Sequence, residues 1–514
     1  MTAESITVVD LFAGAGGFST GAADAVDDVR QDPDVDVRLI AVNHDEDAIA
    51  THEQNHPWAE HYHAKVEELH PPNVVEPGSV DLLIAGPMCT HFSNARGGQP
   101  VDEQMRASPW HVLHWIQLLQ PTNIIVENVR ELRSWGPIVD GEPTRDGSIF
   151  EQWVGTLQAL GYTINRDDDG NFGVILCAAD YGDPTTRKRL FVMGSRTHRP
   201  TAPEPTHSDD PNDDLPNWRP AADVIDWTDP GSSVWTRSKP LSATTMRRIA
   251  EGVRQHCDDR LEPFADAIAG LTPADVERMQ ADVVDVADAE TAVEERDEPF
   301  LVTGDVAEGA ALSVPMVMGQ HTHAKAKPAE SAPVPTLTKR GVIHYIGADA
   351  FVLPRNLPQR GIHSNPTYDP DDRPFHTITA KNNDGHLVSP FLVEYYGNST
   401  AASIDDPLPT VTTKARHALI VPECYPWGLD LRYRLLEPDE TKQAQGFPAD
   451  YEIVGDTKKS IRKQIGNAVP VNMAAALCRH VLTTEMPSLS TFGGGIQADP
   501  GAEIPPYEEV IGDD

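Results

Sequence analysis

The apolar residues of the first 200 positions form short continuous runs, and stretches with helical spacing lie between them. Six short runs predict strands at 6–12, 37–43, 80–86, 123–129 and near 172–178 and 189–194. Helical periodicity predicts helices from about residue 18 and over 46–55, 108–121 and 150–162. Strands that alternate with helices are typical of a parallel sheet covered on both faces, so this part of the chain predicts an α/β fold.

The pattern changes after about residue 197 to Pro-rich loops and short strands. A degenerate repeat of Pro, an apolar residue, alternating Thr or Ser, and a basic residue occurs four times, at 239–248, 332–341, 373–382 and 406–415. Alternating Thr-rich stretches favour strands. Two interpretations stay open for the basic turns that follow them: solvated turns of an antiparallel sheet, or loops that contact phosphates.

These changes predict a division of the chain into four parts. Residues 1–197 form the α/β core, and 198–425 form a mostly β, loop-rich domain with an acidic, Ala-rich helical insertion at about 250–312. Residues 426–480 return to the α/β pattern and to the core. Residues 481–514 form an acidic tail with few periodic apolar positions, which predicts disorder.

The charge of the chain is strongly negative, with 79 acidic against 41 basic residues and a formal net charge of −38. Such an acidic shell is an adaptation to very high salt, and we take a halophilic cytoplasm as a hypothesis. Nucleic-acid-binding proteins normally present a basic face. Basic segments survive locally, at 185–189, 245–248, 338–340 and 458–463, so global charge does not exclude nucleic acid as a partner.

Five scattered cysteines without a CxxC pair indicate neither a disulfide framework nor a zinc site. The histidine pairs at 61–63 and 321–323 could bind metal, but we favour solvated loop histidines and expect no metal. The chain starts without a basic signal region, and no apolar run approaches the roughly 18 residues that span a bilayer. We therefore expect a soluble cytoplasmic monomer.

Three features at predicted strand ends suggest chemistry. "DLFAGAGGFSTG" (10–21) places glycines in the first strand-to-helix turn, where backbone can approach a nucleoside ligand. Cys89 follows the strand at 80–86, and Glu127 ends the next one. Ligands bind at the carboxyl ends of strands in open α/β sheets, so the sequence predicts a nucleophile and an acid that face one pocket.

The ordered segments "DLFAGAGGFSTG", "GPMCTHFS", "ENV", "DYGDPTTRKRLF", "QGFP" and "QIGNAVPVNM" resemble the DNA (cytosine-5) methyltransferase family. The resemblance covers about 1–197 and 426–480, and the middle falls where the family keeps its target-recognition domain. It implies a Rossmann-like, S-adenosylmethionine-dependent core and double-stranded DNA as substrate. A restriction endonuclease acting on the same site is then a candidate partner.

The resemblance also implies a mechanism. Cys89 adds as a thiolate to carbon 6 of a flipped-out cytosine, Glu127 protonates ring nitrogen 3, and carbon 5 takes the methyl group. Arg187 and Arg189 match the family's two arginines, which hold the base oxygen and the acidic partner. The residues implied to bind S-adenosylmethionine are Phe12, Gly14, Gly16, Gly17, Asn43 and Asn467.

The sequence departs from the family pattern at several positions. Met88 separates Pro87 from Cys89, Asn43 stands where an acid usually meets the ribose, and Lys65 stands where an Asp usually meets the adenine. Two alternatives therefore stay open: an RNA cytosine-5 methyltransferase, and a non-catalytic DNA-binding relative, which the Lys65 substitution permits. The amino-acid sequence does not reveal which DNA sequence is the target, because recognition loops follow no simple code.

Overall fold

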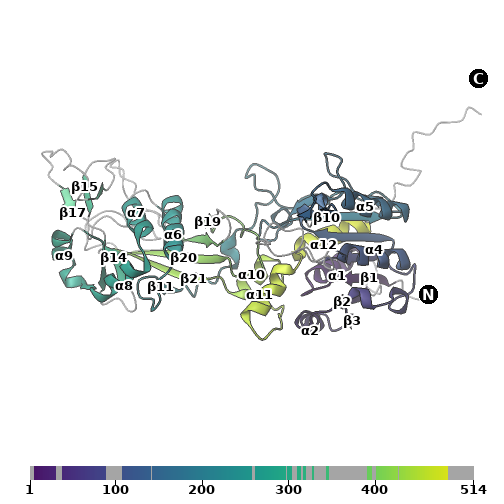
Figure 1. Ribbon diagram of the computed structural model, residues 1–514, viewed down its shortest axis with the longest axis horizontal. Coiled ribbons are helices and arrows are strands. Elements are labelled where there is room, and N and C mark those ends of the chain that lie inside the picture. The colour runs from purple at the N-terminus through teal and green to yellow at the C-terminus, as the bar shows by residue number, and fades with distance from the viewer. Residues whose placement is uncertain are drawn as a thin grey trace, which may run out of the picture.

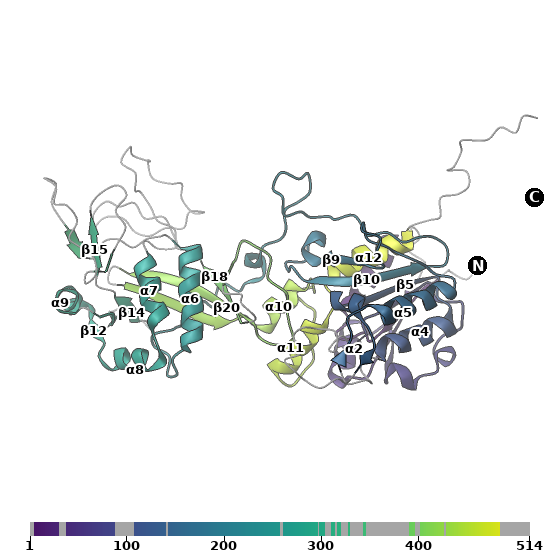
Figure 2. The same ribbon diagram turned by 45° about the horizontal axis from the view of Figure 1, so that its top comes forward.

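A computed structural model describes residues 5–29, 37–87, 107–139, 142–257, 261–296, 298–303, 310–313, 316–319, 327–328, 343–345, 390–395, 401–425 and 428–483. The protein consists of two lobes side by side along its long axis, with α10 (Pro438–Ala444) and α11 (Lys458–Asn467) between them (Figure 1). The same arrangement is visible after a 45° turn (Figure 2). Among the helices in these ranges, none combines the length and apolarity needed to cross a membrane.

The first lobe is built on a sheet with the strand order β3-β2-β1-β4-β5-β10-β8, and β9 pairs with β10. β1 to β5 run parallel, and β10 is antiparallel to β5, β8 and β9. The predicted α/β fold with a Rossmann-like core is thereby confirmed. The strands are β1 (Ile6–Leu11), β2 (Val37–Asn43), β3 (Glu60–His63), β4 (Leu82–Ala85), β5 (Asn123–Asn128), β8 (Thr163–Ile164), β9 (Val174–Cys177) and β10 (Lys188–Ser195).

Helices cover both faces of this sheet because its strands are apolar on both sides. Val8 packs with α1 and α12 on one face, and Val9 packs with α4 and α5 on the other. α12 lies against α1, so the end of the described chain completes the core that its beginning starts (Figure 1). The helices of this lobe are α1 (Gly17–Val29), α2 (Glu46–Asn55), α4 (Ser108–Leu119), α5 (Ser148–Ala159) and α12 (Val471–Thr483). Short elements around them are η1 (Val66–Glu68), η2 (Pro71–Asn73), η4 (Arg130–Ser134), η5 (Ala178–Tyr181) and the hairpin β6 (Ile138–Val139) and β7 (Glu142–Pro143).

The second lobe has a largely antiparallel sheet with the order β12-β13-β14-β21-β20-β18-β19, and β11 pairs with β21. Helices α6, α7 and α8 bury apolar residues such as Ile249, Phe264 and Val276 with Phe391 of this sheet. The strands are β11 (Ser232–Ser233), β12 (Val284–Asp285), β13 (Phe300–Thr303), β14 (Ala310–Ser313), β18 (Phe391–Glu394), β19 (Ala401–Ser403), β20 (His417–Tyr425) and β21 (Gly428–Leu435). The helices are α6 (Ala243–His256), α7 (Glu262–Gly270), α8 (Pro273–Ala281) and α9 (Ala289–Glu295), with η6 (Ala221–Val224) and η8 (Val286–Asp288) beside them. A small separate sheet contains β15 (Met316–Gly319), β16 (Lys327–Pro328) and β17 (Ile343–Tyr345).

Two details of this lobe differ from the sequence-based expectation. The Thr-rich stretch 239–248 leads into helix α6, because Ser242 accepts a hydrogen bond from the Thr245 backbone N–H and caps it. The stretch 250–312 is not wholly helical, since β13 and β14 within it pair into the sheet. The Thr-rich stretch 406–415 contains only an isolated bridge, and 332–341 and 373–382 lie outside the described residues.

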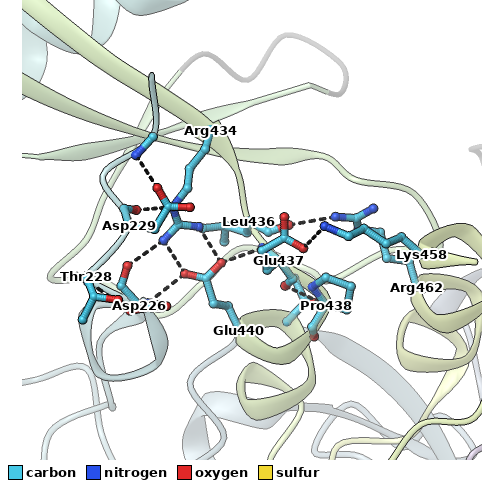
Figure 3. Close-up of polar contacts among 12 residues, drawn as sticks. Asp226, Thr228, Asp229, Arg434, Leu436, Glu437, Pro438, Glu440, Lys458 and Arg462 are labelled. Carbon is cyan, nitrogen blue, oxygen red and sulfur yellow. Dashed lines mark hydrogen bonds and ion pairs between the residues drawn. The ribbon is translucent and has the colours of Figure 1, made fainter. Parts of the chain in front are cut away.

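A buried ion pair joins the two lobes (Figure 3). Arg434, at the end of β21, donates from both terminal nitrogens to the two carboxylate oxygens of Glu440 at 2.7 Å each. Glu440 lies on α10 (Pro438–Ala444), which precedes α11 (Lys458–Asn467). Its carboxylate also accepts from the backbone N–H groups of Asp226 and Glu437. The exposed fractions of the side chains are only 9% and 3%, so this pair fixes β21 to α10 out of water.

Candidate active site

The glycine turn between β1 and α1 has an unusual backbone. Phe12 has a φ of 64°, a region that side chains other than glycine rarely occupy, and Gly14 and Gly16 have positive φ values of 57° and 89°. A Cβ built on Gly14 would meet only the Phe12 carbonyl oxygen, at 3.7 Å. The backbone at Gly14 is therefore accessible to a ligand.

The other two glycines of this turn face protein. A Cβ on Gly16 would lie 2.5 Å from the Tyr451 hydroxyl oxygen, and one on Gly17 would overlap the Val469 carbonyl oxygen. The Tyr451 hydroxyl also donates to the Ala15 carbonyl at 2.5 Å. These glycines let the C-terminal segment pack directly on the turn.

Asn43 ends β2 beside this turn, because β1 and β2 are parallel and the Ala13 N–H donates to the Val42 carbonyl at 3.2 Å. Its buried side chain accepts from the Asp45 backbone N–H at 2.9 Å, which fixes its orientation. Lys65 lies just beyond the next strand, half-exposed, with its Nζ 3.5 Å from Glu68 Oε1. Two of the positions that depart from the family pattern thus lie at one edge of the sheet.

Glu127 and Arg189 form an ion pair at the same edge. Arg189 Nε lies 3.0 Å from Glu127 Oε1, and the two side chains are 16% and 9% exposed. β10 runs antiparallel to β5, which brings the start of β10 to the end of β5 where Glu127 lies. An arginine in this position holds the carboxyl group beside it in a fixed orientation.

The chain that leaves β4 passes directly by Glu127. A Cβ on Gly86 would lie 3.8 Å from Glu127 Oε2, and the Pro87 carbonyl accepts from the Asn128 side chain at 3.0 Å. The expected nucleophile, Cys89, falls in 88–106, which lies outside the described residues. Its predicted proximity to Glu127 therefore stays a prediction, based on the course of the chain up to Pro87.

Arg187 and Asn467 lie on the C-terminal side of the site. Arg187 is buried, and its Nη1 donates to the carbonyls of Val411 at 3.0 Å and Gly466 at 2.9 Å. Asn467 is the exposed last residue of α11, and the next residue, Ala468, packs against Gly17. Asn467 thus lies close to the glycine turn.

Several groups that support the turn were missed by sequence reasoning. Burial raises the pKa of Asp10 to about 7, although Ser19 donates a 2.6 Å hydrogen bond to its carboxylate. Burial lowers the pKa of His56 to about 4, and also lowers that of His52 well below its usual value. Both histidines lie under Gly16. His52 lies in the predicted helix 46–55 and His56 directly follows it, so their spacing of four residues was the available signal.

One histidine of the 61–63 stretch, His61, takes part in this packing, whereas His63 is exposed. His61 Nε2 lies 2.8 Å from His52 Nδ1, so this residue belongs to a buried cluster and not to a solvated loop. Within the described ranges, no group of three His, Cys, Asp or Glu side chains is arranged to hold a metal ion. Residues 321–323 lie outside those ranges.

The chain matches one protein family and several named relatives. The family model for C-5 cytosine-specific DNA methylases matches residues 6–260 and 373–483. The type II methyltransferase M.AgeI of Thalassovita gelatinovora is 30% identical over 206 residues, which cover 39% of this chain and 42% of M.AgeI. M.HgiDI of Herpetosiphon aurantiacus is 31% identical over 191 residues, 37% of this chain and 52% of that protein. Each match spans about half of the relative's length or less. A solved DNA modification methyltransferase encoded within an E. coli prophage is 18% identical, with a TM-score of 0.41 over 92% of this chain and 98% of that one.

Proposed function

Because the chain belongs to the C-5 cytosine-specific DNA methylase family, we propose that it transfers a methyl group from S-adenosylmethionine to carbon 5 of cytosine in double-stranded DNA. The observation that carries the proposal is the Glu127–Arg189 pair at the edge of the sheet where the chain leaves β4 toward Cys89. A carboxyl group oriented by an arginine, next to a strand that leads to a cysteine, suits acid-assisted nucleophilic addition.

Cys89, Glu127 and Arg189 each have a separate role in the proposed reaction. The Cys89 thiolate forms a bond to carbon 6 of the cytosine while Glu127 delivers a proton to ring nitrogen 3, so that the electron pair becomes available at carbon 5. Carbon 5 uses this pair to bond the methyl group and then loses its proton to solvent. The bond from carbon 6 to sulfur breaks, the thiolate leaves, and ring nitrogen 3 returns its proton to the Glu127 carboxylate. Arg189 keeps the Glu127 carboxyl turned toward the base. A stacked base cannot be reached in a duplex, so the cytosine is flipped out.

The residues at the glycine turn fit the cofactor that this reaction needs. S-adenosylmethionine, when bound, supplies the electrophilic methyl group. The accessible backbone at Gly14 supports binding there, with Phe12 beside it and the oriented Asn43 amide at the neighbouring strand end. Gly16 and Gly17 shape the turn through their close packing. We assign Asn467 to the C-terminal side of the cofactor because the next residue, Ala468, contacts Gly17. Lys65, with an exposed amino group, cannot accept a hydrogen bond from an adenine.

The proposal is tested by incubating the purified protein with S-adenosylmethionine that carries a labelled methyl group and with unmethylated DNA or RNA. Label in DNA cytosine is expected, and label in RNA alone would support an RNA methyltransferase instead. Duplexes that contain 5-fluorocytosine separate the remaining alternative. Fluorine cannot leave carbon 5 as a proton does, so the enzyme should stay covalently attached, whereas a non-catalytic relative would bind without forming an adduct.

The domain organisation follows from the same proposal. We propose that residues 198–435 read the target sequence, that 1–197 and 436–483 carry out the chemistry, and that the residues after 483 take no part. These bounds replace the expected ones at 425/426 and 480/481, because β21 pairs with β20 in the second lobe and α12 continues to Thr483 with Val481 buried. The names of relatives such as M.AgeI support a place in a restriction-modification system, with an endonuclease that cuts the same site.

A further inference from the structure

Three segments distant in sequence meet at the loop that precedes β10. The Leu408 N–H donates to the Pro184 carbonyl at 3.0 Å, and the Thr186 N–H donates to the Leu408 carbonyl at 2.9 Å. Asp183, which begins this loop, is buried and accepts from the Met473 N–H at the start of α12 at 3.0 Å. The loop therefore contacts both the C-terminal part of the core and residues 408–413, which we call the recognition strip because they lead into β20 of the second lobe.

Arg187 hydrogen-bonds to both the recognition strip and α11. A single nitrogen, Nη1, donates to the Val411 carbonyl of the recognition strip and to the Gly466 carbonyl in the last turn of α11. The side chain is only 3% exposed, so these hydrogen bonds are shielded from water. A Cβ on Gly466 would overlap the backbone of Thr412 and Thr413, which means that α11 and the strip are in direct backbone contact.

The two arginines of the "TTRKR" segment have different partners. Arg189 contacts Glu127, whereas Arg187 is directed to two backbone carbonyls from different segments. Gly466 is followed directly by Asn467, one of the residues expected to bind S-adenosylmethionine. Any shift of the strip relative to α11 is therefore transmitted to the cofactor side of the site, and Arg187 opposes that shift.

We propose that Arg187 is a positioning residue that locks the recognition strip onto α11 and so couples target recognition to cofactor binding. The inference rests on the proposed function and deepens it: Arg187 acts through Gly466 and Asn467 and does not hold the base oxygen. It differs from a base contact in one measurable respect. A base contact matters only when DNA is present, whereas the lock between the strip and α11 exists without DNA.

The test is calorimetric titration of the full chain with S-adenosylmethionine in the absence of DNA. Arg187→Met removes the donor to both carbonyls and should weaken binding by about tenfold, the size of one lost charge-assisted hydrogen bond. Arg187→Lys keeps one positive donor and should recover part of the loss. Arg189→Met should bind the cofactor as the wild type does while losing methyl transfer, because its contact is with Glu127.

The matched control is Arg196→Met. Arg196 lies just past the other end of β10 and also donates to a backbone carbonyl, that of Gln120 at 3.2 Å, but it is exposed and distant from the strip. This variant should keep cofactor affinity within about twofold, since exposed contacts of this kind contribute little. Circular dichroism at the titration temperature establishes that each variant is folded.

If Arg187→Met does not fold, Gly466→Ala provides the same test from the other side, because its new Cβ pushes the strip away from α11 while Arg187 stays intact. It too should weaken cofactor binding. If the Arg187 variants kept their cofactor affinity but lost methyl transfer as Arg189→Met does, the proposal would be overturned. Arg187 would then be assigned to the oxygen of the cytosine base. Failure of the wild type to methylate DNA, with the affinity pattern as predicted, would instead refute the proposed function.

Discussion

Replacing Glu440 with glutamine should destabilise the junction between the lobes strongly, although the two side chains have nearly the same shape. The carboxylate accepts four hydrogen bonds, two from Arg434 and one each from the N–H groups of Asp226 and Glu437. A glutamine amide has one oxygen and an NH2 group. In either orientation its NH2 group faces donors, so at least two of the four hydrogen bonds are lost.

The expected cost follows from the burial of the pair. Removing one partner of a buried ion pair typically costs about 3–5 kcal/mol, because the other charge remains out of water. Arg434 keeps further contacts here: its Nη2 donates to the Asp226 carbonyl at 2.8 Å, and its Nε donates to the Asp229 carbonyl at 2.5 Å and lies 3.9 Å from Asp229 Oδ2. We therefore expect a loss at the lower end of the range, about 3 kcal/mol in the free energy of unfolding.

Urea unfolding followed by far-UV circular dichroism measures this loss. The control is Lys458→Met, which removes the neighbouring Lys458–Glu437 ion pair at 2.6 Å, with side chains 64% and 45% exposed. An exposed pair of this kind should contribute less than about 1 kcal/mol. If Glu440→Gln proved no more destabilising than Lys458→Met, the buried Arg434–Glu440 pair would not be what fixes β21 to α10.

Three further outcomes are expected. Glu127→Gln should slow methyl transfer by at least about tenfold, because an amide cannot deliver a proton to the ring; a smaller loss would argue against the acid role. The free energy of unfolding of the wild type relative to His56→Gln should fall as pH decreases from 6.5 to 4, because the unfolded state protonates His56 first while its folded-state pKa is about 4. The comparison between the two proteins isolates His56, since the raised pKa of buried Asp10 contributes the opposite slope in the same range; urea titrations that show the same pH dependence for both proteins would exclude the His56 contribution. Methylation of DNA should rise with potassium chloride up to about 1 M before it declines, because screening removes the repulsion between DNA and a chain of charge −38; a monotonic fall from about 0.1 M with the protein folded would refute the halophilic hypothesis.

Most of the parallel core could be predicted from sequence because β1, β2, β4 and β5 are short apolar runs, whereas β3, with the polar sequence EHYH, has no such signal and was missed. Runs such as 37–43 and 123–129 became β2 and β5 within one residue. The family resemblance carried by the motifs is confirmed by the family model. The sequence pattern gave a wrong prediction where a helix cap was possible. Ser242 and Thr245 lie in an alternating stretch typical of a strand, yet the hydrogen bond between them caps the start of α6.

The contacts of the site could not be predicted in the same way, because their partners are far apart in the chain. Arg187 is 224 residues from Val411 and 279 from Gly466, and no local pattern links them. The sequence predicts that the glycine turn binds a ligand, and the accessible backbone at Gly14 supports this prediction. Gly16 and Gly17 are additionally required by packing against Tyr451 and Val469, which only the folded chain reveals.

The central claim is that this chain methylates carbon 5 of cytosine in DNA through Cys89. The most direct test is mass spectrometry of the nucleosides in DNA from cells that express either the wild type or Cys89→Ser, in a host without cytosine methylation of its own. A serine hydroxyl is a far weaker nucleophile than a thiolate near neutral pH, so the variant should fold normally and lose the modification. We predict 5-methyldeoxycytidine with the wild type and none with Cys89→Ser. Equal 5-methyldeoxycytidine from both proteins, or methylation on an exocyclic nitrogen alone, would contradict the account.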